Sequence, residues 1–162
     1  MFLFYLLRLV ERWFSLASTC VKWGCHITHF FNVFAGIRQG GALSPCLFAI
    51  YVDDVVKKIY NSDLGCNLSF ICTSVFLYAD DILLLSPSVH ALQAMLLTCE
   101  QELLPLDLCL NHNKSVCIRV RPRFNADCVK LTTCNLYGHE LDWINTCRYL
   151  GIFFCYRPII QM

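Results

Sequence analysis

The segment that most restricts the fold of this chain is an apolar run interrupted by two adjacent acids, FLYADDILLL at 76–85. The runs on either side, TSVFLYA and ILLLS, are rich in β-branched and aromatic residues, and each has the length of a strand rather than a helix. Separated only by Asp80 and Asp81, they predict a hairpin over 74–79 and 82–86 with both carboxylates at its tip. Because the runs are apolar on both faces, we expect this hairpin to be buried.

Two interpretations of the Asp80–Asp81 pair remain open at this point. Aspartate favours tight turns, so turn chemistry alone could account for both residues. Adjacent carboxylates in a poorly solvated place repel each other, however, and are usually held by a cation or a metal. Carboxylates that clamp two Mg²⁺ ions are how polymerases and many nucleases activate an attacking oxygen and stabilise the leaving one.

A second acidic pair, Asp53 and Asp54, lies in a helical pattern. A Ser-Pro dipeptide at 44–45 supplies an N-cap and a first-turn proline, so we expect a helix over 45–60. The acids precede Lys57 and Lys58 in the i, i+4 order that stabilises helices. One apolar stripe follows the other side of this helix: Phe48, Tyr51, Val52, Val55, Val56 and Ile59. The Asp53–Asp54 pair therefore has a structural interpretation.

Composition limits the class of protein. A chain of 162 residues with 57% apolar residues has the size and the core of one domain, here taken as 1–162. Its apolar runs are shorter than the roughly 20 residues of a membrane-spanning helix, and no basic leader opens the chain. We expect no membrane partner and an intracellular protein, nuclear or cytoplasmic, with its 12 cysteines reduced. CHITH at 25–29 fits none of the usual zinc spacings.

Positive charge concentrates late in the chain, although the formal net charge is only +1. In SVCIRVRPRF, Arg119, Arg121 and Arg123 alternate with apolar residues, so a strand would present a basic stripe on one face. Such a stripe suits a nucleic-acid backbone. A solvated strand face near a sheet edge, with Pro122 blocking further pairing, explains the pattern equally well.

Four motifs in order carry a family resemblance: GIRQGGALSPCLFAIYVDD at 36–54, FLYADDILLL, LNHNKSVCIRV at 110–120 and RYLGIFF at 148–154. Together they resemble the palm region of the reverse transcriptases, or RNA-directed DNA polymerases, of non-LTR (LINE-like) retrotransposons. The resemblance runs from about Val21 to Phe154. It also implies a structural role for Asp53 and Asp54, because YVDD directly after RQGGALSP corresponds to the helix that follows that motif.

The resemblance implies a role for each matched residue. Asp80 would be the main Mg²⁺ ligand, with Mn²⁺ as an alternative metal, and Asp81 the accompanying carboxylate. Tyr78 and Ala79 would lie under the primer end and the incoming nucleotide, and Lys114 would be the ammonium near the leaving pyrophosphate. The residues assigned to the nucleotide and template are Arg38, Gln39, Gly40 and Gly41. Those assigned to the primer grip are Tyr149, Leu150 and Gly151.

The resemblance also implies partners and a missing part. The partners would be an RNA template, a DNA primer and deoxynucleoside triphosphates. The family's third carboxylate lies before RQGG, where this sequence has only Glu11 ahead of Asp53. We therefore expect a palm fragment without fingers, first carboxylate motif or thumb, catalytically incomplete by itself. Two further possibilities are a non-catalytic nucleic-acid-binding remnant and an inert product of a decayed mobile element.

The expected fold class is α+β, an antiparallel sheet with helices packed on one face. The expected helices are at 2–17, 45–60 and 88–104. The expected strands are a pair at 20–35 around Gly24, the hairpin 74–79 and 82–86, strands at 115–121 and 128–133, and a hairpin around Gly138 to Leu150.

Overall fold

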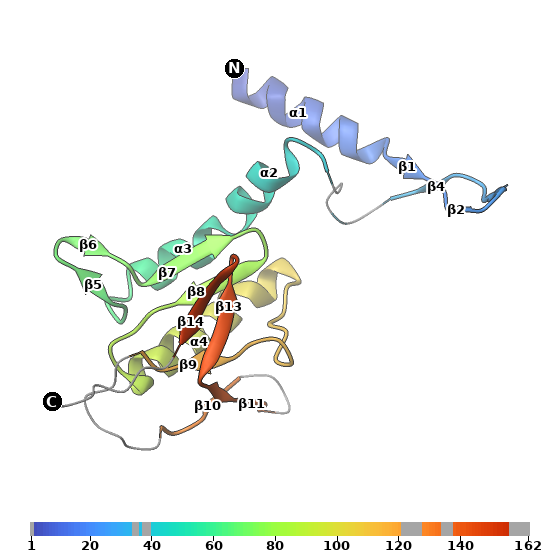
Figure 1. Cartoon of the computed structure of the whole chain (residues 1–162). Helices are drawn as coiled ribbons and strands as arrows, with labels where there is room; N and C mark the ends of the chain where they lie inside the picture. The colour runs from blue at the N-terminus through green and yellow to red at the C-terminus, as the bar shows by residue number, and fades with distance from the viewer. Residues whose placement is uncertain (1, 34–35, 37–39, 121–127, 134–137, 156–162) are drawn as a thin grey trace, which may run out of the picture. The chain divides into compact units, whose positions relative to one another are not determined.

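The computed structural model of the chain describes residues 2–33, 36, 40–120, 128–133 and 138–155. The chain divides into two compact units, Met1–Ser44 and Pro45–Met162. Each unit has its own helices and paired strands (Figure 1). Helices and short strands occur together, which confirms the α+β class in its broad form.

The first unit consists of a helix and a β-ribbon. Helix α1 spans Phe2–Ser15, close to the predicted 2–17. In the ribbon, β1 (Ser18–Thr19) pairs with β4 (Phe31–Asn32), and β2 (Lys22–Trp23) pairs with β3 (His26–Ile27). Gly24 has a φ of 60° in the connecting turn, a conformation that glycine adopts without a steric penalty. The predicted strand pair around Gly24 is therefore confirmed.

The predicted helix over 45–60 is present but divided in two. Helix α2 spans Ser44–Tyr51 and α3 spans Asp53–Tyr60, with Val52 between them at φ −99° and ψ 5°. The hydrogen bonds from Val52 N to Phe48 O (3.1 Å) and from Val56 N to Val52 O (3.3 Å) keep the helical spacing across the break. Val52 is 2% exposed, so the interruption does not release it from the interior.

Strands β7 (Val75–Tyr78) and β8 (Asp81–Leu84) form the predicted hairpin, with one correction. Tyr78 pairs directly with Asp81, so the two central turn residues are Ala79 and Asp80 rather than the two aspartates. This register adds one more pair to the ladder and places Ala79 in the left-handed region at φ 50°. Asp81 is consequently a strand residue, and Asp80 alone occupies the tip.

Helix α4 spans Val89–Leu103, as predicted for 88–104, and a 3₁₀ turn, η1 (Leu104–Leu106), follows it. Ser88 caps the helix, because its Oγ accepts a hydrogen bond from Ala91 N at 3.1 Å. The core lies between α3, α4 and the β7–β8 hairpin. Its buried members are Val55, Ile59, Met95, Cys99 and Leu103, and a second cluster contains Leu96, Cys117, Leu131 and Leu141.

The remaining strands differ most from expectation. A hairpin of β5 (Asn67–Leu68) and β6 (Ile71–Cys72) was not predicted. Strand β9 (Cys117–Ile118) pairs in parallel with β12 (Trp143–Ile144), and β10 (Leu131–Thr132) pairs with β11 (Glu140–Leu141). The hairpin expected around 138–150 is wrong: β13 (Thr146–Tyr149) and β14 (Ile152–Cys155) turn at Leu150 and Gly151 instead.

Within the described residues each strand pairs with one other strand only. These residues therefore do not form the one continuous antiparallel sheet that we expected. No helix in the described part of the chain is long and apolar enough to cross a membrane.

Candidate active site

The β7–β8 hairpin has one packed face and one open face. Residues directly opposite each other share a face, and Val75, Ile82 and Leu84 pack on the core beneath α3 and α4. Tyr78, on the other face, is 62% exposed, and both Asp80 and Asp81 are exposed. The expectation of buried carboxylates is therefore wrong, because only one side of the hairpin contacts the interior.

The two aspartates of this hairpin have no cationic partner in the part of the chain that the structure describes. Within the described residues no lysine, arginine or histidine forms an ion pair with Asp80 or Asp81. Two adjacent carboxylates, exposed and uncompensated, make a locally negative turn that favours a cation.

A hollow of about 300 Å³ lies beside the turn. Its lining comes from the start of α2 and from the end of β7 with the first turn residue: Pro45, Phe48, Ala49, Leu77, Tyr78 and Ala79. The sequence predicted Tyr78 and Ala79 for such a position, whereas the contribution of α2 was not predicted. Aromatic and aliphatic walls next to a pair of carboxylates suit a ligand with a flat apolar part and an anionic part that carries a metal.

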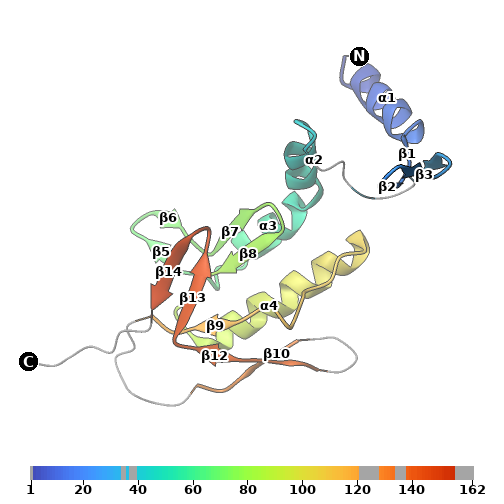
Figure 2. The same cartoon turned by 45° about the vertical axis from the view of Figure 1, so that its right-hand side comes forward.

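The β13–β14 hairpin approaches the acidic turn. Burial raises the pKa of Tyr149, and the charge of Asp81 raises it further. Figures 1 and 2 both show the end of this hairpin beside β7 and β8. Leu150 and Gly151 form its turn, both at positive φ (50° and 81°). The hairpin that carries the predicted primer-grip residues thus lies beside the two strands that flank the predicted metal ligands.

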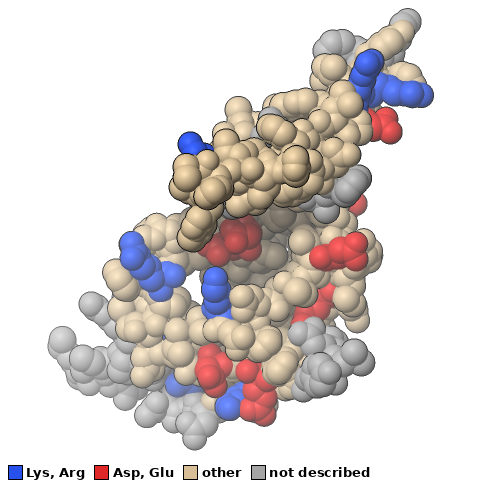
Figure 3. Space-filling view, turned by 90° about the vertical axis from the view of Figure 1, so that its right-hand side faces the viewer, with Lys and Arg blue, Asp and Glu red and all other residues tan. Residues whose placement is uncertain are grey.

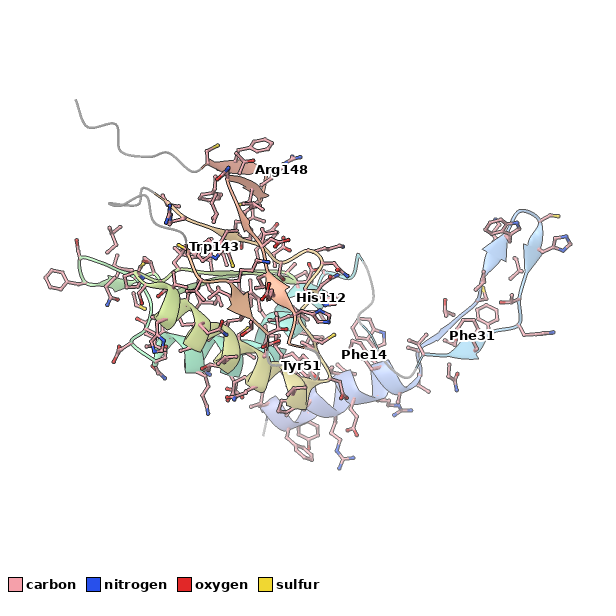
Figure 4. The ribbon with its side chains drawn as sticks, turned by 90° about the horizontal axis from the view of Figure 1, so that it is seen from below. Phe14, Phe31, Tyr51, His112, Trp143 and Arg148 are labelled. Carbon is pink, nitrogen blue, oxygen red and sulfur yellow. The ribbon has the colours of Figure 1, made fainter. Side chains whose placement is uncertain are left out.

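The two faces of the β13–β14 hairpin differ. Cys147, Tyr149 and Phe154 are half-buried on one face, and burial raises the pKa of the Cys147 thiol. On the other face the Arg148 guanidinium lies over the Phe153 ring, 5.7 Å from its centre. Figure 4 shows Arg148 on the side turned away from the helices. The Tyr149 side therefore faces the body of the unit.

Lys114 lies in an exposed turn before β9, where its N–H donates to Asn111 O at 3.0 Å. The turn is braced by His112, whose ring stacks on that of His139 with 3.8 Å between centres and 3° between planes (Figure 4). Within the described residues Lys114 makes no ion pair with Asp80 or Asp81. Its predicted role near the pyrophosphate stays a prediction.

The RQGG motif belongs to the first unit. Arg38 and Gln39 lie outside the described residues. Gly40 has a φ of 77°, and a Cβ added there would meet nothing within 4 Å. Its need for glycine is therefore conformational, because L-residues rarely adopt that φ. The predicted contact of Gly40 and Gly41 with nucleotide and template stays a prediction.

The predicted basic stripe is weaker than its sequence suggests. Arg119 is half-buried, and its Nη1 donates to Cys128 Sγ at 3.4 Å. Lys130 pairs with Glu140 at 2.8 Å and approaches Asp142 at 3.8 Å. Lys130 lies after the stripe in sequence, and the two acids that compensate its charge were not weighed with the basic residues. Arg121 and Arg123 lie outside the described residues. On the face in Figure 3, acidic and basic side chains are interspersed.

The donor set fits a hard divalent cation. Mg²⁺ is typically held by one or two carboxylates together with waters and substrate phosphates, and Asp80 with Asp81 supply such carboxylates. Within the described residues no three His, Cys, Asp or Glu side chains come together in a group that could hold a metal ion. Any third protein ligand would therefore have to come from outside the arrangement described.

Comparison with known proteins assigns the family. Residues 5–154, which include both units, match the family described as reverse transcriptase (RNA-dependent DNA polymerase). The chain belongs to the reverse transcriptase family. This match confirms the resemblance inferred from RQGGALSP, YADD and the later motifs.

The curated relatives are retrotransposon polyproteins. The chain is 28% identical over 151 residues to a retrovirus-related Pol polyprotein from type-1 retrotransposable element R2 of Popillia japonica. It is 27% identical over 124 residues to that from type-2 retrotransposable element R2DM of Drosophila melanogaster. These matches cover 85% and 74% of this chain but only 24% and 12% of the relatives. They confirm that the chain is part of a reverse transcriptase of the non-LTR retrotransposon class. The chain spans about a quarter or less of the length of these relatives.

Proposed function

We propose that this chain forms the palm part of an RNA-directed DNA polymerase in which Asp80 and Asp81 hold the catalytic Mg²⁺, or Mn²⁺ in its place. The observation that carries the proposal is the acidic pair at the end of the β7–β8 hairpin: two adjacent, exposed carboxylates without a cationic partner among the described residues. Family membership supplies the reaction class, which is transfer of a nucleotide to a primer end. The substrates proposed are an RNA template, a DNA primer and deoxynucleoside triphosphates.

Different side chains of this chain would have different roles in nucleotide transfer. The hollow beside Tyr78 and Ala79 would receive the sugar and base at the primer end, and its apolar wall would exclude water from that side. Lys114 would offer an ammonium to the leaving pyrophosphate, as a proton donor or a counter-charge. When bound, the metal would supply charge neutralisation at the phosphates. Most of the rate in such a site comes from positioning and electrostatics.

A second candidate, nucleic-acid binding without chemistry, is favoured by one observation. The described residues contain no group of three possible ligands, so metal binding by Met1–Met162 alone is expected to be weak. On this proposal the chain holds an RNA–DNA hybrid through Arg119, Arg121 and Arg123 but extends a primer slowly. An inert product of a decayed element would do neither.

Primer extension with Mg²⁺ on an RNA template tests the first proposal. Asp80→Asn should lower incorporation about 10²–10³-fold, the scale of losing one preorganised electrostatic group. The matched control is Asp54→Asn, the same chemical change in the other acidic pair, at a side chain that is 90% exposed. Incorporation that Asp80→Asn leaves at the parent level would refute the assignment of the metal site.

Hybrid binding measured against salt concentration separates the remaining candidates. Binding that survives Asp80→Asn but falls when Arg119 and Arg121 are replaced, in a parent that does not extend primers, would support the binding role. Absence of hybrid binding at low salt in the parent would exclude it.

A further inference from the structure

Helix α2 supplies one wall of the hollow beside the β7–β8 turn, yet little of its own packing holds it in place. Phe48 and Ala49 of this helix line the hollow together with the end of β7. No residue of α2, all of which the structure describes, is buried, whereas α3 buries Val55 and Ile59. Because packing of an apolar face is what chiefly holds a helix in a folded chain, the position of α2 needs another source.

The backbone between α2 and α3 departs from helical geometry. Val52 has φ −99° and ψ 5°, values in the sparsely populated bridge region. Residues at the end of an element are those that absorb changes in backbone angle when one element moves against another. The packing of α3 therefore does not by itself fix the direction of α2.

A hydrogen bond from the last residue of α2 reaches a distant part of the sequence. The Tyr51 hydroxyl donates to Leu106 O at 2.8 Å, between residues 55 apart in the chain, and Figure 4 shows Tyr51 beside the C-terminal end of α4. Leu106 ends the 3₁₀ turn η1, and the last carbonyls of a helix have no partner within it. The Leu106 side chain packs against the core cluster of α3 and α4, so the acceptor stands on the packed part of the unit.

The hydrogen bond acts close to the wall of the hollow. Tyr51 follows Phe48 by three residues, and residues three apart are neighbours on one side of a helix. Holding the tyrosine therefore also holds the phenylalanine beside it. Tyr51 is 50% exposed, so water competes for both partners, and the net effect of this one hydrogen bond is modest.

We propose that Tyr51 is a positioning residue: its hydrogen bond to Leu106 O holds the end of α2 and so keeps Phe48 in place as a wall of the hollow that receives the primer end. This inference rests on the proposed function of that hollow. It also gives a task to the YVDD segment at 51–54, whose acids pair with Lys57 and whose tyrosine the sequence pattern placed in an apolar stripe.

Steady-state primer extension by Tyr51→Phe in the whole chain tests the proposal. The matched control is Tyr60→Phe, at a tyrosine that is 51% exposed at the end of α3. Tyr51→Phe should raise the KM for primer–template about 2–10-fold, the scale of one net hydrogen bond, and leave kcat nearly unchanged. The split arises because the wall contacts bound nucleic acid rather than the reacting atoms. Tyr60→Phe should change neither constant, and a parent-like KM in Tyr51→Phe would overturn the proposal.

Hydrogen exchange followed by mass spectrometry separates a positioning role from general stability and needs no activity. Tyr51→Phe should speed exchange of the α2 amides about 2–10-fold and leave those of α3 and α4 unchanged. Unchanged exchange in α2, or equal acceleration in all three helices, would show that Tyr51 does not hold α2 specifically, and the proposal would fail. If the parent extends no primer, the proposed function of the hollow fails, and exchange alone decides whether Tyr51 holds α2.

Discussion

The same dipeptide, Asp-Asp, occurs twice in this chain with opposite electrostatic surroundings. At the start of α3, Asp53 forms an ion pair with Lys57, and Asp54 lies 3.9 Å from the same ammonium. Both acids stand in the first turn of the helix, where its dipole favours negative charge. At the β7–β8 turn, Asp80 and Asp81 have no cationic partner within the described residues.

The difference shows that local structure, rather than the acids themselves, decides what a carboxylate pair can do. A helix brings a lysine four residues later onto the same face, and the hydrogen bond and charge of Asp53 raise the pKa of Lys57. In a tight hairpin, a residue four positions later does not lie on the same face as the acid, so the sequence spacing places no lysine beside it. The first pair is therefore already compensated, whereas the second is open to a cation from outside.

The first pair is held in place by packing rather than by charge, and removing that packing should have the largest effect. Ile59, on the buried face of α3, is 0% exposed, so Ile59→Ala should lower the free energy of unfolding by about 2–5 kcal/mol. Urea unfolding followed by circular dichroism measures this loss. Asp54→Asn, on the outer face of the same helix, is the control. An equal loss of stability in both variants would contradict the claim that packing rather than charge holds this pair in place.

The second pair depends on a close backbone approach at the base of its hairpin. A Cβ on Gly65 would lie 2.0 Å from Ser74 Cβ and 2.6 Å from Ser74 Cα, directly before β7. Gly65→Ala should therefore cost about 1–3 kcal/mol of stability through forced displacement of this strand. Ser74→Gly in the same chain should restore part of the loss, and purely additive costs would contradict the proposed contact.

Alkaline pH tests the core beneath the first pair through a buried thiol. Burial raises the pKa of Cys99, between α3 and α4, from 9.0 to about 11. The thiol is thus protonated more tightly in the folded chain, so its contribution is complete below pH 9 and is lost as pH rises through 11. Stability should fall by roughly 1–2 kcal/mol across this interval. Cys99→Ala should flatten the decline, and an unchanged slope would point to other groups, such as Cys117.

The sequence predicted those elements whose signal is local. The apolar stripe of α3, the apolar periodicity of the helix predicted at 88–104 and the two strand-length runs around Asp80 each depend on neighbours a few residues apart, and the structure contains all three elements. The division at Val52 and the exact turn at Ala79 were missed, because either choice satisfies the same periodicity. One residue of register was enough to move Asp81 from the turn into a strand.

Long-range pairing could not be predicted in the same way. The parallel pairing of β9 with β12 joins residues about 26 apart, and no short pattern specifies it. Lys130 meets Glu140 only because β10 and β11 pair, so the positively charged part of the sequence late in the chain includes a cation whose charge the fold compensates.

The smallest expected effect concerns the ion pair that distinguishes the first acidic pair. Lys57 is exposed, and exposed i, i+4 pairs contribute little, so Lys57→Met should lower the melting temperature by only about 1–2 °C at low salt. The shift should vanish at 1 M salt, where screening is nearly complete at these distances. Lys22→Met, at an exposed lysine of β2 without an ion pair among the described residues, controls for the loss of charge. A salt-independent loss of several degrees would mean that α3 relies on this pair after all, and the contrast between the two acidic pairs would then rest on the hairpin alone.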